Sequence, residues 1–175
     1  MTETPTRPAA NERGFSLLET VFALSLILVV SLGVLPLGMI ATTTTENQGH
    51  LMARATEYAQ DKMEQLLVLS YGDSVTDTRV FPAAATGGTG LTAGGSADPA
   101  APVALYVDYL DINGGLLASA GTTAPATWYY KRVWAGSVPS TNLKQISVTA
   151  TVKSAVGGIG RTPRATVVSL KTFPF

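Results

Sequence analysis

Glu19 is the one ionisable side chain in the apolar stretch that runs from Phe15 to Ala41. A stretch of this length crosses a hydrocarbon layer about 30 Å thick, so it predicts a single membrane-spanning helix near the N-terminus. A carboxylate in such a helix costs roughly 2.5–3.5 kcal/mol on insertion scales and needs compensation. Two interpretations remain open: the carboxylate snorkels to the membrane interface, or a positive group on another subunit neutralises it.

Metal binding and catalysis find little support in the residue types. The chain has no cysteine and a single histidine, His50, which excludes histidine-rich and thiolate metal sites. The stretch Asp111-Ile112-Asn113-Gly114 partly resembles a calcium loop, but Tyr109 and Ala120 stand where two further acidic ligands are needed. We therefore expect no enzymatic activity, no cofactor and no bound metal.

Positive charge is concentrated in the C-terminal part of the chain. All twelve acidic residues lie at or before Asp111 with five Lys and Arg, and seven Lys and Arg follow it, so the two parts carry −7 and +7. Such asymmetry indicates contact with the acidic part of a neighbouring subunit or with a polyanion such as DNA. The alternative is that these cations bind no partner and only keep an exposed sheet soluble. The candidate contact residues are Lys131, Arg132, Lys144, Arg161 and Arg164.

Aromatic and cationic side chains are interleaved between residues 128 and 134. This composition suits stacking on nucleic-acid bases and contacts to phosphates. It equally suits an ordinary strand whose aromatic side chains cover a helix, which is the interpretation we favour; subunit contact is a further alternative. The period of two over residues 127–135 predicts that one face carries Trp128, Tyr130, Arg132 and Trp134.

A second, amphipathic half of the helix is predicted over residues 42–71. It is expected to end near Gly72, because glycine suits a helix C-terminal cap. Pro36 in the first half predicts a kink or local melting. Lys62 and its acidic neighbours lie mainly off the predicted apolar stripe. Members of that stripe recur every three or four positions and are Met52, Ala55, Ala59, Met63, Leu66 and Ser70.

The remainder of the chain predicts a loop followed by strands. Residues 72–102 are rich in Gly, Ala, Thr and Pro and predict a surface loop. From residue 103 the period is two, so residues 103–175 predict an antiparallel sheet, with Asn113-Gly114 as a two-residue hairpin. Further strands are expected over residues 127–135, 143–154 and 164–173. A long helix followed only by hairpin-linked strands is an α+β arrangement.

The residues Arg13-Gly14-Phe15-Ser16-Leu17-Leu18-Glu19 and the apolar run after them resemble the class III signal of type IV pilins and type II secretion pseudopilins. The resemblance implies the lollipop fold of pilins, with a helix of residues 15–71 packed on the sheet. It implies cleavage between Gly14 and Phe15 by a prepilin peptidase, N-methylation of Phe15, and pairing of Glu19 with the N-terminal amine of a neighbouring subunit. Residues 1–14 are then a cytoplasmic leader, and residues 15–41 form the transmembrane and filament-core helix.

Two other targeting signals compete with this interpretation. A secretory signal peptide has an apolar core of about 7–15 residues, with its cleavage site after the core. Here the run is longer and the proposed cleavage site, at Gly14, precedes it. An uncleaved signal anchor fits the hydropathy equally well, but it explains neither Gly14 nor Glu19.

Residues 53–66 also resemble minor pilins of the PilV type and the I-type pseudopilin. We therefore expect a structural subunit of a type IV pilus-like or type II secretion filament. The implied location is the inner membrane, with an extracytoplasmic C-terminal domain, and then a filament in the periplasm or on the cell surface. The implied partners are the peptidase, other pilin or pseudopilin subunits, an inner-membrane assembly platform and lipid. The alternative is a membrane-anchored module for DNA uptake or adhesion that uses the basic sheet.

Overall fold

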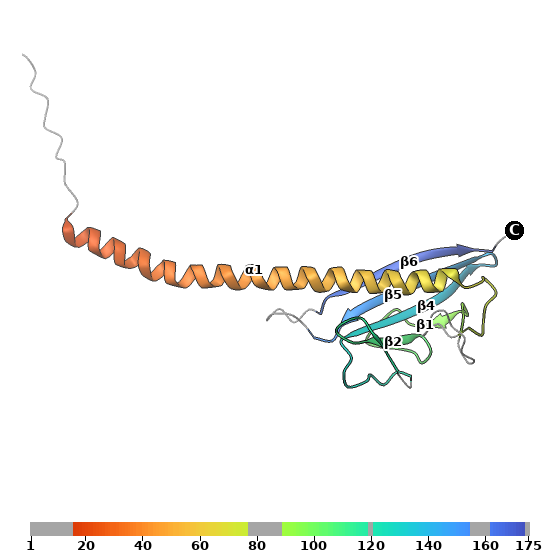
Figure 1. Ribbon diagram of the computed structural model, residues 1–175. Coiled ribbons are helices and arrows are strands. Elements are labelled where there is room, and N and C mark those ends of the chain that lie inside the picture. Colours follow the sequence, from red (N-terminus) through yellow and green to blue (C-terminus); the bar gives the residue numbers. More distant parts are fainter. Residues whose placement is uncertain (1–15, 77–88, 119–120, 155–161, 174–175) are drawn as a thin grey trace, which may run out of the picture. The chain divides into compact units, whose positions relative to one another are not determined.

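A computed structural model describes residues 16–76, 89–118, 121–154 and 162–173. The chain divides into two compact units, Met1–Thr43 and Thr44–Phe175, and helix α1 (Leu17–Val68) contributes to both. The second unit also contains an antiparallel sheet (Figure 1). The architecture is therefore α+β, with one long apolar N-terminal helix and a C-terminal sheet, as the sequence predicts.

The described strands form one sheet with the order β3-β2-β4-β5-β6, and β1 pairs with β4 beyond the end of β2. All neighbours in this sheet are antiparallel. The strands are β1 (Gly94–Gly95), β2 (Val107–Leu110), β3 (Leu116–Leu117), β4 (Tyr130–Ser140), β5 (Leu143–Val152) and β6 (Arg164–Thr172).

The C-terminal part of α1 lies across one face of the sheet (Figure 1). Small side chains at Ala55 and Ala59 are fully buried there, which lets the helix approach the strands closely. Larger side chains, Met63 and Leu66, fill the next turns. The facing strand residues share one side of the sheet because side chains alternate along a strand; they include Trp134, Ile146, Val148 and Ala150.

The opposite face of the sheet has a smaller core. Val107, Tyr109 and Val133 are buried there, and Trp128 packs against them. The Tyr109 hydroxyl donates to the carbonyl oxygen of Thr122 at 2.7 Å, which ties the loop before β4 to this face. Burial raises the pKa of the Tyr109 phenol.

Helix α1 ends at Val68 rather than near residue 71, and Gly72 is not its cap. A lysine of β6 supplies the cap instead: the ammonium of Lys171 donates to the carbonyl oxygens of Leu67 and Leu69. Terminal helix carbonyls lack partners within the helix, so a cation from the sheet satisfies them and opposes the helix dipole. Two residues predicted for the apolar stripe, Met52 and Ser70, are exposed.

The start of β2 also differs from the prediction. Alternation predicts a strand from residue 103, but β2 begins at Val107. Leu105 has a φ of 69°, and the Tyr106 amide donates to the Val103 carbonyl oxygen at 3.0 Å, so these residues form a turn. A left-handed leucine carries no signal in the hydrophobic pattern, which is why the turn was missed.

The hairpin predicted around Asn113-Gly114 is present, since β2 pairs with β3 across it, but its loop is longer than two residues. The Asp111 amide donates to the Gly115 carbonyl oxygen at 2.9 Å. The Asp111 carboxylate accepts hydrogen bonds from the amides of Asn113 and Gly115, both at 2.8 Å. Gly114, with a φ of 87°, takes the left-handed position that such loops require.

Strand β1 lies inside the segment that was predicted to be only a loop. Gly95 has a φ of 79°, and a Cβ atom there would lie 2.3 Å from the carbonyl oxygen of Trp134. The pairing of β1 with β4 therefore needs glycine at this position. Glycines also hide the strand from sequence reasoning, because they show no apolar alternation.

Gly95→Ala is expected to lower the free energy of unfolding by about 1–3 kcal/mol, through backbone strain and the collision with Trp134. Urea unfolding of the full chain in detergent, followed by tryptophan fluorescence, measures this change. Gly72→Ala is the matched control, since a Cβ atom there meets nothing within 4 Å. Equal stability of the two variants would show that β1 does not approach β4 this closely.

Candidate functional site

The N-terminal part of α1 exposes apolar side chains along its whole length. From Leu17 to Ala41 no residue is buried, and every large apolar side chain is at least 54% exposed. By length and composition this helix can cross a membrane. Contiguous apolar surface of this extent marks a contact with lipid or with other apolar segments.

Glu19 lies in the first turn of this helix. The carbonyl oxygen of Ser16 accepts hydrogen bonds from the amides of Glu19 at 3.0 Å and Thr20 at 3.2 Å, and the Ser16 hydroxyl lies 3.3 Å from the Glu19 amide. Ser16 and Glu19 thus have the spacing of a capping box, and a carboxylate at a helix start also favours the helix dipole. This local role was missed in the sequence, although the Ser-x-x-Glu pattern signals it.

Gly14 and Phe15 lie outside the described residues, so cleavage, methylation and the pairing of Glu19 with an amine stay predictions. Pro36 lies within α1, and the helix continues through it, so local melting is absent there and the predicted kink stays a prediction. Beyond it, the hydroxyls of Thr42 and Thr43 donate to the Met39 carbonyl oxygen at 2.9 and 3.0 Å. Such bonds compete with the helical ladder and favour bending.

The basic residues of the sheet are largely engaged within the chain. The ammonium of Lys131 donates to the Pro99 carbonyl oxygen at 2.6 Å. That of Lys144 donates to the carbonyl oxygens of Tyr71 and Leu91, at 2.6 and 2.8 Å. Burial lowers the pKa of Lys131. Arg164 is exposed at the start of β6, and Arg161 lies outside the described residues.

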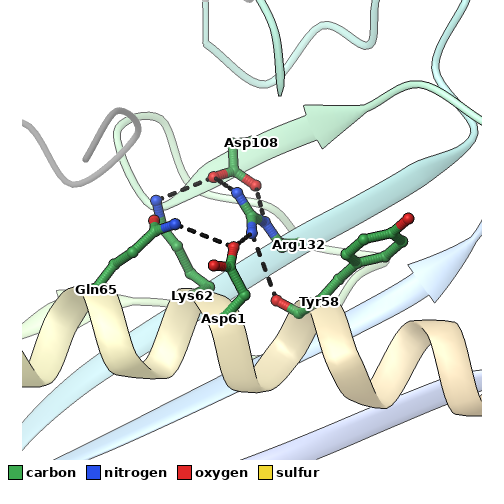
Figure 2. A network of polar contacts seen from close by, with 6 residues as sticks. All are labelled: Tyr58, Asp61, Lys62, Gln65, Asp108 and Arg132. Atoms are coloured by element: carbon green, nitrogen blue, oxygen red, sulfur yellow. Dashed lines mark hydrogen bonds and ion pairs between the residues drawn. The ribbon is translucent and has the colours of Figure 1, made fainter. Parts of the chain in front are cut away.

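Arg132 was predicted to be a surface contact residue, but its side chain is only 3% exposed. Its Nε and Nη2 donate to the two carboxylate oxygens of Asp108, at 2.7 and 2.9 Å. Its Nη1 donates to Asp61 Oδ2 at 2.7 Å and approaches the Tyr58 carbonyl oxygen at 3.5 Å (Figure 2). This guanidinium is buried and its donors are already bonded to Asp108 and Asp61, so it is not available to a polyanion. The prediction that Arg132 is a surface contact residue is therefore wrong.

Lys62 is the second buried cation, and the prediction that it lies off the stripe is also wrong. Its side chain is fully buried, with Nζ 3.0 Å from Asp108 Oδ2 and 4.2 Å from the centroid of the Trp134 ring. The positions Ala55, Ala59, Lys62 and Leu66 fall four, three and four apart, which is the spacing of the buried helix face. The periodicity was therefore sufficient to place Lys62, but its charge argued against burial.

Four charged side chains connect α1 to β2 and β4. We call Asp61, Lys62, Asp108 and Arg132 the ionic cluster. Burial alone raises the pKa of Asp108, but the ammonium of Lys62 and the guanidinium of Arg132 outweigh it, so this pKa lies below its usual value. Asp108 is therefore a carboxylate that carries its negative charge between two cations.

The aromatic side chains of the basic stretch lie on two faces of the sheet. Tyr130 and Trp134 face α1, as predicted. The prediction that Trp128 shares their face is wrong: β4 begins only at Tyr130, and Trp128 packs on the opposite face against Tyr109, with 5.9 Å between ring centroids. The ammonium of Lys153 lies 5.5 Å from the Trp128 ring. Aromatic groups divided in this way do not make one platform for stacked bases.

Metal-binding groups are dispersed over the part of the chain that the structure describes. There, no three His, Cys, Asp or Glu side chains gather as a metal site needs. His50 lies on an exposed turn of α1. The expected absence of enzymatic activity, metal and cofactor stays a prediction.

No protein-family model, no curated protein and no solved structure matches this chain. Its function is therefore inferred from its own residues and their placement.

Proposed function

We propose that this chain is a structural subunit, a minor pilin or pseudopilin, of a type IV pilus-like filament. The observation that carries the proposal is the N-terminal half of α1, whose apolar side chains are exposed throughout and follow a motif that resembles a prepilin signal. Lipid covers this surface before assembly, and the apolar helices of neighbouring subunits cover it in the filament. The α+β layout, with the C-terminal part of α1 on an antiparallel sheet, also fits the pilin lollipop fold.

Processing and assembly follow from this proposal. A prepilin peptidase cleaves between Gly14 and Phe15, Phe15 is N-methylated, and the leader stays in the cytoplasm. Glu19 then pairs with the Phe15 amine of a neighbouring subunit, because an unpaired charge in a bundle of apolar helices is penalised. This pairing sets the axial register of the subunits, and the sheet domain stays on the extracytoplasmic side of the inner membrane.

The mass of the N-terminal peptide tests the proposal most directly. We expect protein from the native membrane to begin at Phe15 with one added methyl group. The same form in material sheared from cells would favour a surface pilus over a short secretion filament. An intact Met1 or Thr2 terminus, with the protein confined to the membrane, would reject processing and filament assembly.

The alternative, a membrane-anchored module that binds DNA or an adhesion target through the basic sheet, has less support. Arg132 is buried in the ionic cluster, and Lys131 and Lys144 donate to backbone carbonyls. Binding to DNA depends on Lys and Arg that can reach phosphates. Of the five candidate cations, only Arg164 is exposed in the described part of the chain, so we do not propose this function.

A further inference from the structure

We infer that the ionic cluster is a register lock, in which Asp61 and Lys62 determine the turn of α1 that lies over β2 and β4. The inference concerns residues 44–175 and holds whether or not the chain assembles into a filament. It assigns a positioning role to charged residues that the proposed function does not use.

Apolar character alone leaves the axial position of α1 open, and only the small size of Ala55 and Ala59 favours the observed one. The buried helix face repeats every three or four residues through Ala55, Ala59, Met63 and Leu66. It begins at the partly buried Leu51, and the buried Leu69 directly follows the end of the helix. A slip by one turn, about 5.4 Å, therefore still places apolar side chains on the apolar sheet face.

The ionic cluster tolerates no such slip. Asp108 and Arg132 are directly opposite each other on β2 and β4 and bond through both carboxylate oxygens, so they are fixed within the sheet. The helix supplies Lys62 to Asp108 and Asp61 to Arg132 (Figure 2). These two residues are consecutive on one helix, so a slip that moves one of them away from its partner also moves the other away. After a slip the Lys62 ammonium would be buried without a carboxylate, which is strongly unfavourable.

Two spin labels on the full chain in detergent micelles test the inference. Ala53→Cys and Thr172→Cys place the labels at exposed positions of α1 and β6, and the chain has no other cysteine. The test variant is Asp61→Ala with Lys62→Met, which keeps net charge and leaves the Asp108–Arg132 pair intact. We expect one narrow distance in the parent and an additional distance, displaced by up to about 5.4 Å, in the variant.

The control removes a different ion pair from the same helix. Arg54 and Glu57 lie 3.1 Å apart, and their side chains are 59% and 60% exposed. Arg54→Ala with Glu57→Ala is expected to keep the parent distance. A single parent-like distance in the Asp61/Lys62 variant would overturn the inference, since side-chain size would then set the register. If that variant does not fold, Asp61→Ala with Lys62→Leu is measured instead, because it also removes both contacts. An unbroadened distance in that variant overturns the inference equally.

Discussion

Asp108→Ala is expected to destabilise the sheet domain by about 3–5 kcal/mol, because it leaves two buried cations without their shared partner. Lys62 and Arg132 both contact the Asp108 carboxylate, and the three side chains are at most 3% exposed. Removing the carboxylate does not remove the cost of burying its partners. The expected loss is comparable to a large part of the stability of a small domain.

Urea unfolding of the full chain in detergent measures this effect, because urea does not screen charge. Trp134 lies against Lys62 in the core, so its fluorescence reports on the site. Glu64→Ala is the matched control: it removes one negative charge from an exposed position of α1, and we expect a change within about 0.5 kcal/mol. Similar losses in the two variants would mean that the ionic cluster contributes no more than a surface charge.

The same carboxylate predicts how stability depends on pH. The pKa of Asp108 is lower in the folded chain than in the unfolded chain, where it is about 3.9. Its contribution is therefore complete above the unfolded value and is lost as the pH falls through the folded value. The parent protein should lose stability below about pH 4, and the Asp108→Ala variant should show a weaker dependence over that range.

Periodicity predicted the exposed helix and the last two strands of the sheet. The exposed helix of residues 17–41 follows from an apolar run with one charge. Strands β5 and β6 follow from alternation, and their starts, Leu143 and Arg164, agree with the predicted ones. In these segments local sequence and tertiary environment favour the same structure, so reasoning from pattern is sufficient.

The ionic cluster was not predictable, because its parts come from three distant segments. Lys62 has the spacing of the buried helix face, but its charge favours the surface until Asp108 is known to lie beneath it. Arg132 reads as a binding residue until its guanidinium is placed between two carboxylates. The capping of α1 by Lys171 is similar, since the lysine is far from the helix in sequence. The sequence shows that these cations are present, but only the fold shows that they contact carboxylates and backbone carbonyls within the chain.

Glu19→Ala is expected to insert in the membrane normally but to be depleted in assembled filaments. If Glu19 pairs as proposed, the substitution leaves the Phe15 amine of a neighbouring subunit unpaired among apolar helices. A charge in that setting costs roughly 2.5–3.5 kcal/mol on insertion scales, which corresponds to about a hundredfold weaker incorporation. The amounts of the protein in membrane and sheared fractions measure this, with the mass of the N-terminal peptide confirming that processing still occurs at Phe15.

Ser16→Ala separates the proposed contact between subunits from the local role of Glu19. The Ser16 hydroxyl lies 3.3 Å from the Glu19 amide, so its loss weakens the start of α1 but keeps the carboxylate. If Glu19 acts on a neighbouring subunit, the Ser16 variant assembles normally and only the Glu19 variant is depleted. If both are depleted to the same degree, Glu19 acts by capping its own helix. Normal incorporation of Glu19→Ala would remove the register role altogether, and the snorkelling interpretation of Glu19 would then be favoured.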